Sequence, residues 1–221
     1  RVPDPVKPLL GGILLGLLGI VSYQIDGFPR VFGVGYETIE NTLFSQLTLQ
    51  VTFGLLLLKL LATTLTLGSG GSGGIFAPSL FMGAMLGASF GQIAHNLFPE
   101  IVAPSGAYAL VGMAAFFGGA AHAPITAILI LFEMTGDYQI ILPLMLSTVL
   151  STIVSRNLSP DSIYTLKLKR RGVELSQETQ AIDLMQGVTA EIAMNRDTDA
   201  VPSDMSLVEL MSTFSSTHYN A

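Results

Sequence analysis

Long apolar stretches separated by short polar breaks dominate the first three quarters of the chain. Between Asn41 and Phe132 the only formal charges are those of Lys59 and Glu100. A stretch this long is too long for one helix, so it predicts several membrane segments. The apolar stretches cover residues 8–22, 43–67, 78–98, 107–121, 124–134 and 140–154.

Glycines recur at four-residue spacing in two of these stretches. Gly12 and Gly16 lie on one helical face, and a second set consists of Gly83, Gly87 and Gly91. Small residues at this spacing let helix backbones approach closely inside a bilayer. The spacing therefore predicts two close-packing faces.

The shorter apolar stretches are the most informative about function. A stretch of about 10 to 14 residues is too short to cross a hydrocarbon core of about 30 Å. In a membrane protein it predicts a half-helix that ends at membrane depth. Such an end leaves backbone N–H and C=O groups that lipid cannot satisfy, so it must line a polar cavity or the protein interior. The pattern therefore favours a transport protein.

The composition agrees with a membrane protein and excludes several other classes. Of the 221 residues, 50% are hydrophobic and 12% are charged, and the mean hydropathy is +0.59. The net charge of −6 argues against nucleic acid as a partner. The absence of cysteine excludes disulfides, zinc–thiolate sites and cysteine nucleophiles.

Both ends of the chain suggest a piece of a longer protein. The first residue is Arg1 rather than Met, and no signal peptide precedes the first apolar stretch. Residues 215–221 contain neither a helix cap nor a turn signal. Lysines and arginines cluster within residues 167–171, directly after the last apolar stretch. Basic residues in this position predict that the tail lies in the cytoplasm.

The tail from residue 166 onward is expected to be soluble. Ser206 and Glu209 form a capping box. One apolar helical face follows the box and consists of Leu207, Leu210, Met211 and Phe214. Residues 198–201 precede this helix and are typical of a strand.

The glycine-rich break before Pro78 is the leading candidate for a functional site. Glycines let the backbone turn and approach a ligand closely, and Pro78 suits the first turn of a helix. The N–H groups of Ile75, Phe76 and Ala77 are then expected at a helix N-terminus, which carries about half a positive charge. The pattern predicts an anion site inside the membrane that needs no lysine or arginine.

Gly73 and Gly74 complete the predicted loop in front of this helix. A flexible Gly/Ser linker is the alternative interpretation of residues 68–74. Apolar stretches adjoin both ends, however, and a mobile linker at membrane depth would leave its backbone groups unsatisfied. An anion held only by partial charges can still leave, as conduction or exchange requires.

Tyr164 follows the last apolar stretch near a second predicted helix start. Ser159, Pro160 and Asp161 supply an N-cap, a first-turn proline and an acidic first turn. The Tyr164 hydroxyl is able to donate to an anion, whereas its spacing alone favours an aromatic residue at the membrane interface.

Two ionisable residues in apolar surroundings, Lys59 and Glu133, are also candidates. Lys59 either sets the potential at the glycine-rich break, snorkels towards water or pairs with a carboxylate. Glu133 either connects two helices or relays protons. His95 and His122 are isolated, which favours packing roles.

A serine hydrolase is the alternative enzymatic interpretation. Residues 70–74 match G-x-S-x-G, so Ser72 would be the nucleophile and His95 or His122 the base. Any Gly/Ser-rich run produces this match, and no strand precedes Ser72. A phosphate-binding loop is excluded because no Gly-Lys-Ser/Thr follows. No catalytic residue is assigned, and the chain is not expected to be an enzyme.

Residues 73–78, Gly-Gly-Ile-Phe-Ala-Pro, resemble the second anion-site motif of the CLC family of chloride channels and chloride/proton antiporters, some of them voltage-gated. Further segments resemble this family in the same order, and the similarity spans residue 8 to about residue 172. These segments are residues 33–37, 59–70, 131–135, 138–139 and 159–164.

The resemblance implies an all-α, multi-span membrane protein that forms half of an inverted-repeat fold with broken and half-spanning helices. In this family the backbone amides of Ile75 and Phe76 would hold the central chloride, and Tyr164 would donate its hydroxyl. The implied assembly is a homodimer with one pore per subunit. Its contact would include residues 124–134 and 140–154.

The resemblance also implies a domain organisation. Residues 1–165 would belong to the second repeat of the membrane core, and residues 166–180 would form a cytoplasmic linker. Residues 181–221 resemble the short α/β start of a CBS domain. Complete CBS pairs bind adenine nucleotides in some members of the family, but no residue here supports such a site, and no other cofactor or metal is expected.

The implied function is transport of chloride across a membrane, with lipid and the missing N-terminal half of the same protein as further partners. The fragment alone is not expected to conduct. The family's gating and proton glutamates would lie upstream of Arg1, so channel and exchanger remain open alternatives. A CBS-regulated transporter of another ion is the remaining alternative to an anion pore.

Overall fold

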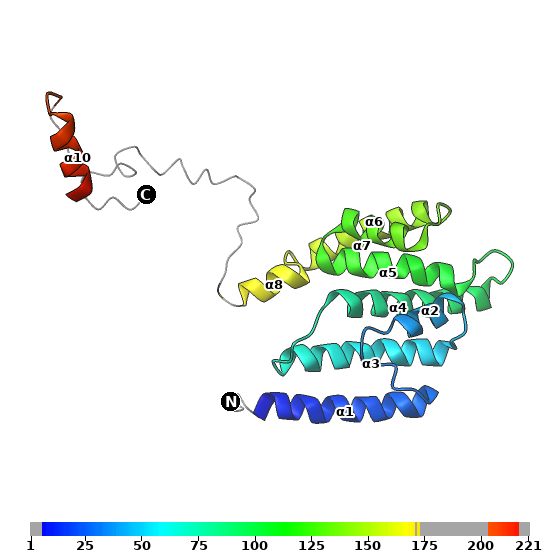
Figure 1. The fold of residues 1–221 in the computed structure, drawn as a ribbon. Helices are drawn as coiled ribbons and strands as arrows, with labels where there is room; N and C mark the ends of the chain where they lie inside the picture. The colour runs from blue at the N-terminus through cyan, green and yellow to red at the C-terminus, as the bar shows by residue number, and fades with distance from the viewer. Residues whose placement is uncertain (1–5, 171, 173–202, 217–221) are drawn as a thin grey trace. The chain divides into compact units, whose positions relative to one another are not determined.

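The computed structural model describes residues 6–170, 172 and 203–216, and it divides the chain into two units, 1–174 and 175–221. The first unit consists of helices stacked in layers (Figure 1). Its longer helices are α1 (Val6–Asp26), α3 (Leu49–Gly68), α4 (Phe76–Leu97), α5 (Ser105–Ala121) and α7 (Ile141–Leu158). Its shorter helices are α2 (Tyr36–Leu43), α6 (Pro124–Thr135) and α8 (Ile163–Lys169).

Helix α4 lies at the centre of the first unit, between α3 and α5 (Figure 1). Its side chains Leu80, Phe81 and Met85 are fully buried and form the middle of the core. Helix α1 packs against α3 on one side of this centre, and α6 and α7 pack against α5 on the other. The core therefore surrounds the helix whose first turn contains the candidate site.

Glycines bring the backbones of α4 and α5 together. A Cβ atom added to Gly83 would lie 2.5 Å from the carbonyl oxygen of Gly112 and 2.7 Å from the Cα atom of Met113. A Cβ atom on Gly87 would meet the backbone of Tyr108. The close-packing face predicted for α4 is therefore confirmed.

The glycine face predicted for α1 is wrong in its details. Gly12 and Gly16 have no neighbouring atom within 4 Å of an added Cβ atom, so they mediate no helix contact in the described structure. Instead Gly11 faces Ser69 and Gly19 faces the ring of Phe32. Glycines at four-residue spacing identify a helix face without side chains, but they do not show whether another helix packs against that face.

Helix lengths agree with the predicted membrane fold. Among the described residues, four segments are long and apolar enough to cross a bilayer: α1, α3, α4 and the segment Ile141–Lys169 that contains α7 and α8. Helices α5 and α6 are apolar but have only 17 and 12 residues. The described residues contain no strand. The prediction of an all-α membrane fold with half-spanning helices is confirmed.

One predicted helix boundary shifts because a turn interrupts residues 43–48. Helix α2 ends at Leu43, and Ser45 has a φ of 57°. Thr48 then provides the extended N-cap residue of α3, so α3 begins six residues later than the apolar pattern predicts.

The second unit contains helix α10 (Leu207–Ser216). Its capping box is present: the N–H of Glu209 donates to Ser206 Oγ at 3.4 Å, and the N–H of Ser206 donates to Glu209 Oε2 at 3.3 Å. The strand expected at residues 198–201 lies outside the described residues, as does most of the expected CBS segment 181–221.

Candidate anion site

The break between α3 and α4 is a tight turn rather than a loose linker. Gly70 has a φ of 86°, which a side chain would strain. The N–H of Gly71 donates to the carbonyl oxygen of Thr66 at 2.9 Å and ties the loop back to the last turn of α3. The backbone then runs to Ile75, which caps α4.

The first turn of α4 presents N–H groups that have no acceptor. The first helical hydrogen bond of this turn joins the N–H of Ser79 to the carbonyl oxygen of Ile75 at 3.1 Å. The N–H groups of Ile75, Phe76 and Ala77 precede it and make no hydrogen bond within the described part of the chain. Pro78 occupies the third position of the helix, where its missing N–H costs no bond. The predicted arrangement of free amides at a helix N-terminus is therefore present.

A cavity of about 410 Å³ adjoins this helix start. Four predicted loop and helix residues line it together: Gly73, Gly74, Ala77 and Pro78. The rest of its wall comes from α1, from the loop before α2, from α3 and from the glycine-rich loop. These residues are Leu15, residues 31–34, Lys59, Ala62, Thr63, Thr66, Leu67 and Ser72. The cavity is mainly apolar, with few polar groups, as small-ligand sites commonly are.

Ile75 and Phe76 point to different surroundings. Ile75 lines a second cavity of about 550 Å³, which the turn shares with α8 residues such as Lys167 and Arg170. The Phe76 ring packs edge-to-face on Phe117, with centroids 4.9 Å apart. The start of α4 therefore borders both cavities, with Ala77 and Pro78 in the wall of the first and Ile75 in the wall of the second.

Tyr164 lies on α8, but the predicted helix start is wrong by three residues. Ser159 is the C-cap of α7, and α8 begins at Ile163 with Ser162 as its N-cap. Ser162 Oγ accepts a hydrogen bond from the N–H of Thr165 at 3.2 Å. Pro160 and Asp161 belong to the turn between the two helices, so Ser159 cannot also cap the second helix.

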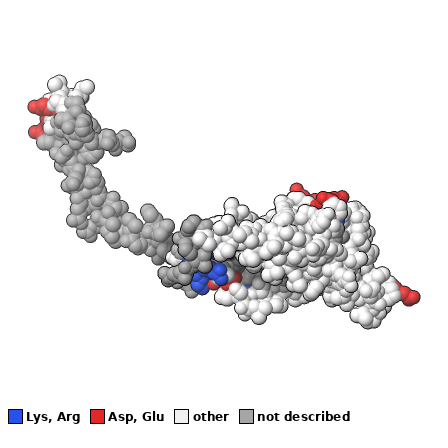
Figure 2. All heavy atoms as spheres, turned by 90° about the horizontal axis from the view of Figure 1, so that it is seen from below, with Lys and Arg blue, Asp and Glu red and all other residues white. Residues whose placement is uncertain are grey.

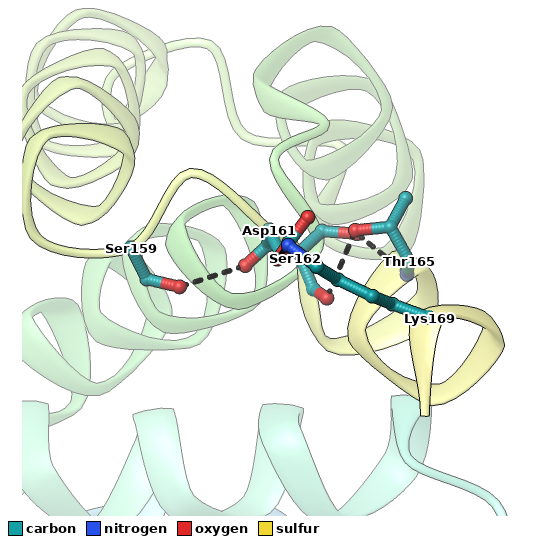
Figure 3. A network of polar contacts seen from close by, with 5 residues as sticks. All are labelled: Ser159, Asp161, Ser162, Thr165 and Lys169. Carbon is teal, nitrogen blue, oxygen red and sulfur yellow. Dashed lines mark hydrogen bonds and ion pairs between the residues drawn. The ribbon is translucent and has the colours of Figure 1, made fainter. Parts of the chain in front are cut away.

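A polar network holds this turn (Figure 3). Ser159 Oγ donates to the carbonyl oxygen of Asp161 at 3.0 Å. Lys169 Nζ lies 2.9 Å from Asp161 Oδ2 and pairs the end of α8 with the turn before it. The network fixes where α8 begins and therefore where Tyr164 lies.

The structure does not bring Tyr164 into either cavity. Its side chain is 45% exposed, and its hydroxyl makes no hydrogen bond to any described residue. Four other α8 residues, Ile163, Leu166, Lys167 and Arg170, line the cavity that contains Ile75. The helix is thus adjacent to the candidate site, while the Tyr164 hydroxyl is not part of the cavity wall.

The sequence predicted an anion site without a lysine or arginine, but the structure places Lys59 in the cavity wall. This residue is 3% exposed and lines the 410 Å³ cavity beside Gly73 and Gly74. Its Nζ atom donates to the carbonyl oxygens of Val31 at 2.9 Å and Gly33 at 2.7 Å. The role of these two carbonyls was not evident in the sequence. In the sequence, only the two glycines at 33 and 35 indicated that this loop has an unusual backbone. Both have positive φ in the structure.

The remaining ionisable candidates lie away from the cavities. Glu133 is exposed near the end of α6 and has no partner among the described residues. The ring of His122 lies 3.3 Å from Ser155 Oγ through Nε2. His95 is exposed in the last turn of α4, roughly 30 Å along the helix from its start. Neither histidine contacts Ser72, so the structure gives the serine hydrolase no support.

Charges are distributed unevenly over the first unit. Figure 2 shows lysines and arginines gathered at one end and most acidic residues towards the other. The last turn of α8 contains Lys167 and Lys169, and Arg170 is its C-cap. The basic end is also the end at which the loop before α4 lies (Figure 1).

Comparison with known proteins places the chain in one family. The Voltage gated chloride channel family model matches residues 1–156. A ClcB-like chloride channel protein of Ralstonia nicotianae is 36% identical over 170 residues, which are 77% of this chain and 38% of that protein. The voltage-gated ClC-type chloride channel ClcB of Escherichia coli K12 is 35% identical over 164 residues, with coverages of 74% and 38%.

A solved structure agrees with these sequence matches. The structure of a slow cyanobacterial Cl⁻/H⁺ antiporter matches with a TM-score of 0.55 and 27% identity, over 77% of this chain and 48% of that one. The chain thus spans well under half of the chloride channel relatives and about half of the antiporter. Since the family model covers more than two thirds of its residues, the chain belongs to the voltage gated chloride channel family.

Proposed function

We propose that this chain forms the second half of the membrane core of a protein that transports chloride, as a channel or as a chloride/proton exchanger. One observation carries the proposal. The free N–H groups of Ile75, Phe76 and Ala77 lie at the start of a membrane helix that borders two cavities. In a low-dielectric setting such amides stabilise a small anion without a covalent or ionic bond.

The proposed anion ligands are the amides of Ile75 and Phe76. The rigid turn at Gly70 and Gly71 supports this assignment because it fixes the entry of the chain into α4. Tyr164 is proposed as a donor from the α8 side, which requires its exposed hydroxyl to turn towards the Ile75 cavity. The relatives named as chloride channels and as a Cl⁻/H⁺ antiporter support chloride as the transported ion.

The test uses the full-length protein that contains this chain, reconstituted in liposomes. Replacing the Phe76 amide by an ester, through incorporation of the corresponding α-hydroxy acid, removes one N–H and keeps the side chain. We expect the chloride concentration for half-maximal flux to rise by roughly tenfold or more, since a hydrogen bond to a charged group contributes about 1.5 kcal/mol or more. The Tyr164→Phe variant should show a smaller increase.

Two controls separate the alternatives. Ser72→Ala should largely preserve chloride flux, because main-chain N–H groups hold the anion, whereas loss of a hydrolytic activity on this substitution would indicate a serine hydrolase. Flux that follows a cation gradient and ignores chloride would indicate a transporter of another ion. An ester at Phe76 with unchanged chloride dependence would contradict the proposed role of the amides.

We also propose a homodimer that forms through α6 and α7. These helices expose large apolar side chains, among them Ile125 at 73% and Leu142 at 74%. Such side chains face either lipid or a second copy, and the short α6 is better shielded by protein than by lipid. A monomeric mass for the full-length protein in mild detergent would contradict this assembly.

The proposed domain organisation keeps residues 1–165 in the membrane core, 166–180 as a linker and 181–221 as the start of a CBS domain. The division of the chain between residues 174 and 175 lies inside the proposed linker and supports it. The capped helix α10 also agrees with a folded cytoplasmic segment.

A further inference from the structure

Lys59 is a buried cation in the middle of a membrane helix. It lies within α3, is 3% exposed and donates from Nζ to the carbonyl oxygens of Val31 and Gly33. Its ammonium group also lies 4.7 Å from the ring centroid of Phe81. Two carbonyl dipoles and an aromatic face are acceptors for the donors of an ammonium group. The donors of the Lys59 ammonium group are therefore bonded within the protein.

The charge of Lys59 is not neutralised by a nearby acid. Within residues 6–170, Lys59 has no carboxylate within ion-pair distance. The walls of the 410 Å³ cavity contain no aspartate or glutamate, and Lys59 is the charged residue among them. A buried charge without a counter-charge is costly unless a mobile ion supplies it. The cavity is therefore electrostatically suited to an anion.

The loop before α2 fixes this charge in place. Gly33 and Gly35 have φ values of 66° and 84°, and a Cβ atom on Gly35 would lie 2.6 Å from Phe81. The loop is thus held between Phe81 and Lys59. Because Nζ is bonded to this loop, Lys59 neither snorkels to the membrane surface nor pairs with a carboxylate. The sequence left three roles open for Lys59: snorkelling, pairing with a carboxylate, and setting the potential at the glycine-rich break. The last of these remains.

We propose that Lys59 is the fixed cation that raises anion occupancy of the cavity beside Gly73, Gly74 and Ala77 and disfavours cations there. The proposal rests on the proposed function, because it assigns a selectivity residue to that same pathway. Lys59 acts through its field and through the loop it positions, and it does not replace the α4 amides as ligands. In surroundings of low dielectric constant this field extends over the width of a small cavity.

The experiment measures chloride flux against chloride concentration for the full-length protein in liposomes. Lys59→Met removes the charge at similar side-chain length, and Lys59→Arg keeps it. Leu58→Met is the matched control, because Leu58 is a buried neighbour on the same helix. We expect Lys59→Met to raise the half-saturating chloride concentration about tenfold with a maximal flux within about twofold of wild type. Lys59→Arg should restore most of the affinity, and Leu58→Met should behave as wild type.

A second pair of variants keeps the proposal testable if Lys59→Met does not fold. Thr63 lines the same cavity one turn after Lys59. Thr63→Glu places a carboxylate beside the ammonium and should raise the half-saturating concentration by a similar factor, whereas Thr63→Gln, of nearly the same size, should not.

The outcomes distinguish this inference from the function on which it rests. A wild-type protein that carries no chloride overturns both. Chloride flux in the wild type, together with an unchanged half-saturating concentration in Lys59→Met or Thr63→Glu, overturns the role of Lys59 alone. Equal losses in Lys59→Met and Lys59→Arg would also overturn it, because they would reflect packing rather than charge.

Discussion

Single glycines determine how closely the central helices approach. Gly83 on α4 and Gly112 on α5 face each other so closely that a Cβ atom on either would meet the carbonyl oxygen of the other. A methyl group at this contact would have to push one backbone away from the other, and overpacking of this kind is destabilising in a close-packed interior.

We therefore expect Gly83→Ala to destabilise the full-length protein by roughly 1–3 kcal/mol. The melting temperature in detergent, followed by circular dichroism, should fall by several degrees. Gly54→Ala is the control, because its added Cβ atom would lie 3.7 Å from Ile25 Cδ1, an ordinary contact. Equal melting temperatures for Gly83→Ala and Gly54→Ala would show that the two helices can separate without cost.

At the level of residues, the sequence predicted the backbone geometry of the glycine-rich break. Glycines followed by a proline required a turn and a helix start, and the free amides at Ile75 and Phe76 follow from that geometry. Prediction left Lys59 open because its partners, the carbonyls of Val31 and Gly33, lie 28 and 26 residues away in sequence. No local pattern identifies a contact of that range.

At the scale of elements, α8 depends on its cap more than on burial. The helix has seven residues and none of them is buried. A helix this short is not stable by itself in water. Its first turn is held by Ser162, and its last turn by the exposed pair of Lys169 with Asp161.

We expect Ser162→Ala to weaken the start of α8 by about 1 kcal/mol. Amide hydrogen exchange at Thr165 should then become about five times faster in the full-length protein. Asp161→Asn serves as the comparison, since a largely exposed ion pair contributes little, and it should change this rate by less than twofold. The reverse order of effects would mean that the ion pair, and not the cap, holds the helix.

The element boundaries show what a sequence pattern can and cannot decide. Ser159 and Ser162 are both good N-cap residues, and Pro160 makes the earlier one look better. The backbone between them is still turning after α7, so only Ser162 reaches a helical N–H. The apolar pattern also predicts that residues 43–48 belong to the same helix as residues 49–67. Hydrophobicity alone does not reveal the turn at Ser45 that separates them.

At the scale of the molecule, charge predicts orientation. Lysines and arginines gather at one end of the first unit, and most acidic residues lie towards the other (Figure 2). The last turn of α8 contains Lys167 and Lys169. Positive residues next to membrane segments favour the cytoplasmic side. We infer that α8 and the residues after it face the cytoplasm.

The absence of cysteine from the chain makes this orientation testable. Single cysteines are introduced as Glu100→Cys and Arg170→Cys in a full-length protein without other cysteines. A membrane-impermeant maleimide should label the first in intact cells and the second only after permeabilisation. Labelling of Arg170→Cys in intact cells would place the tail outside the cell.

The glycine contacts between α4 and α5 have a mechanical consequence. Where two helices contact each other through their backbones, no flexible side chains lie between them to rearrange when one helix shifts along the other. We expect these two helices to move as one rigid block during any transport cycle. Motion would then be confined to parts outside this block, such as the short α8, none of whose residues is buried.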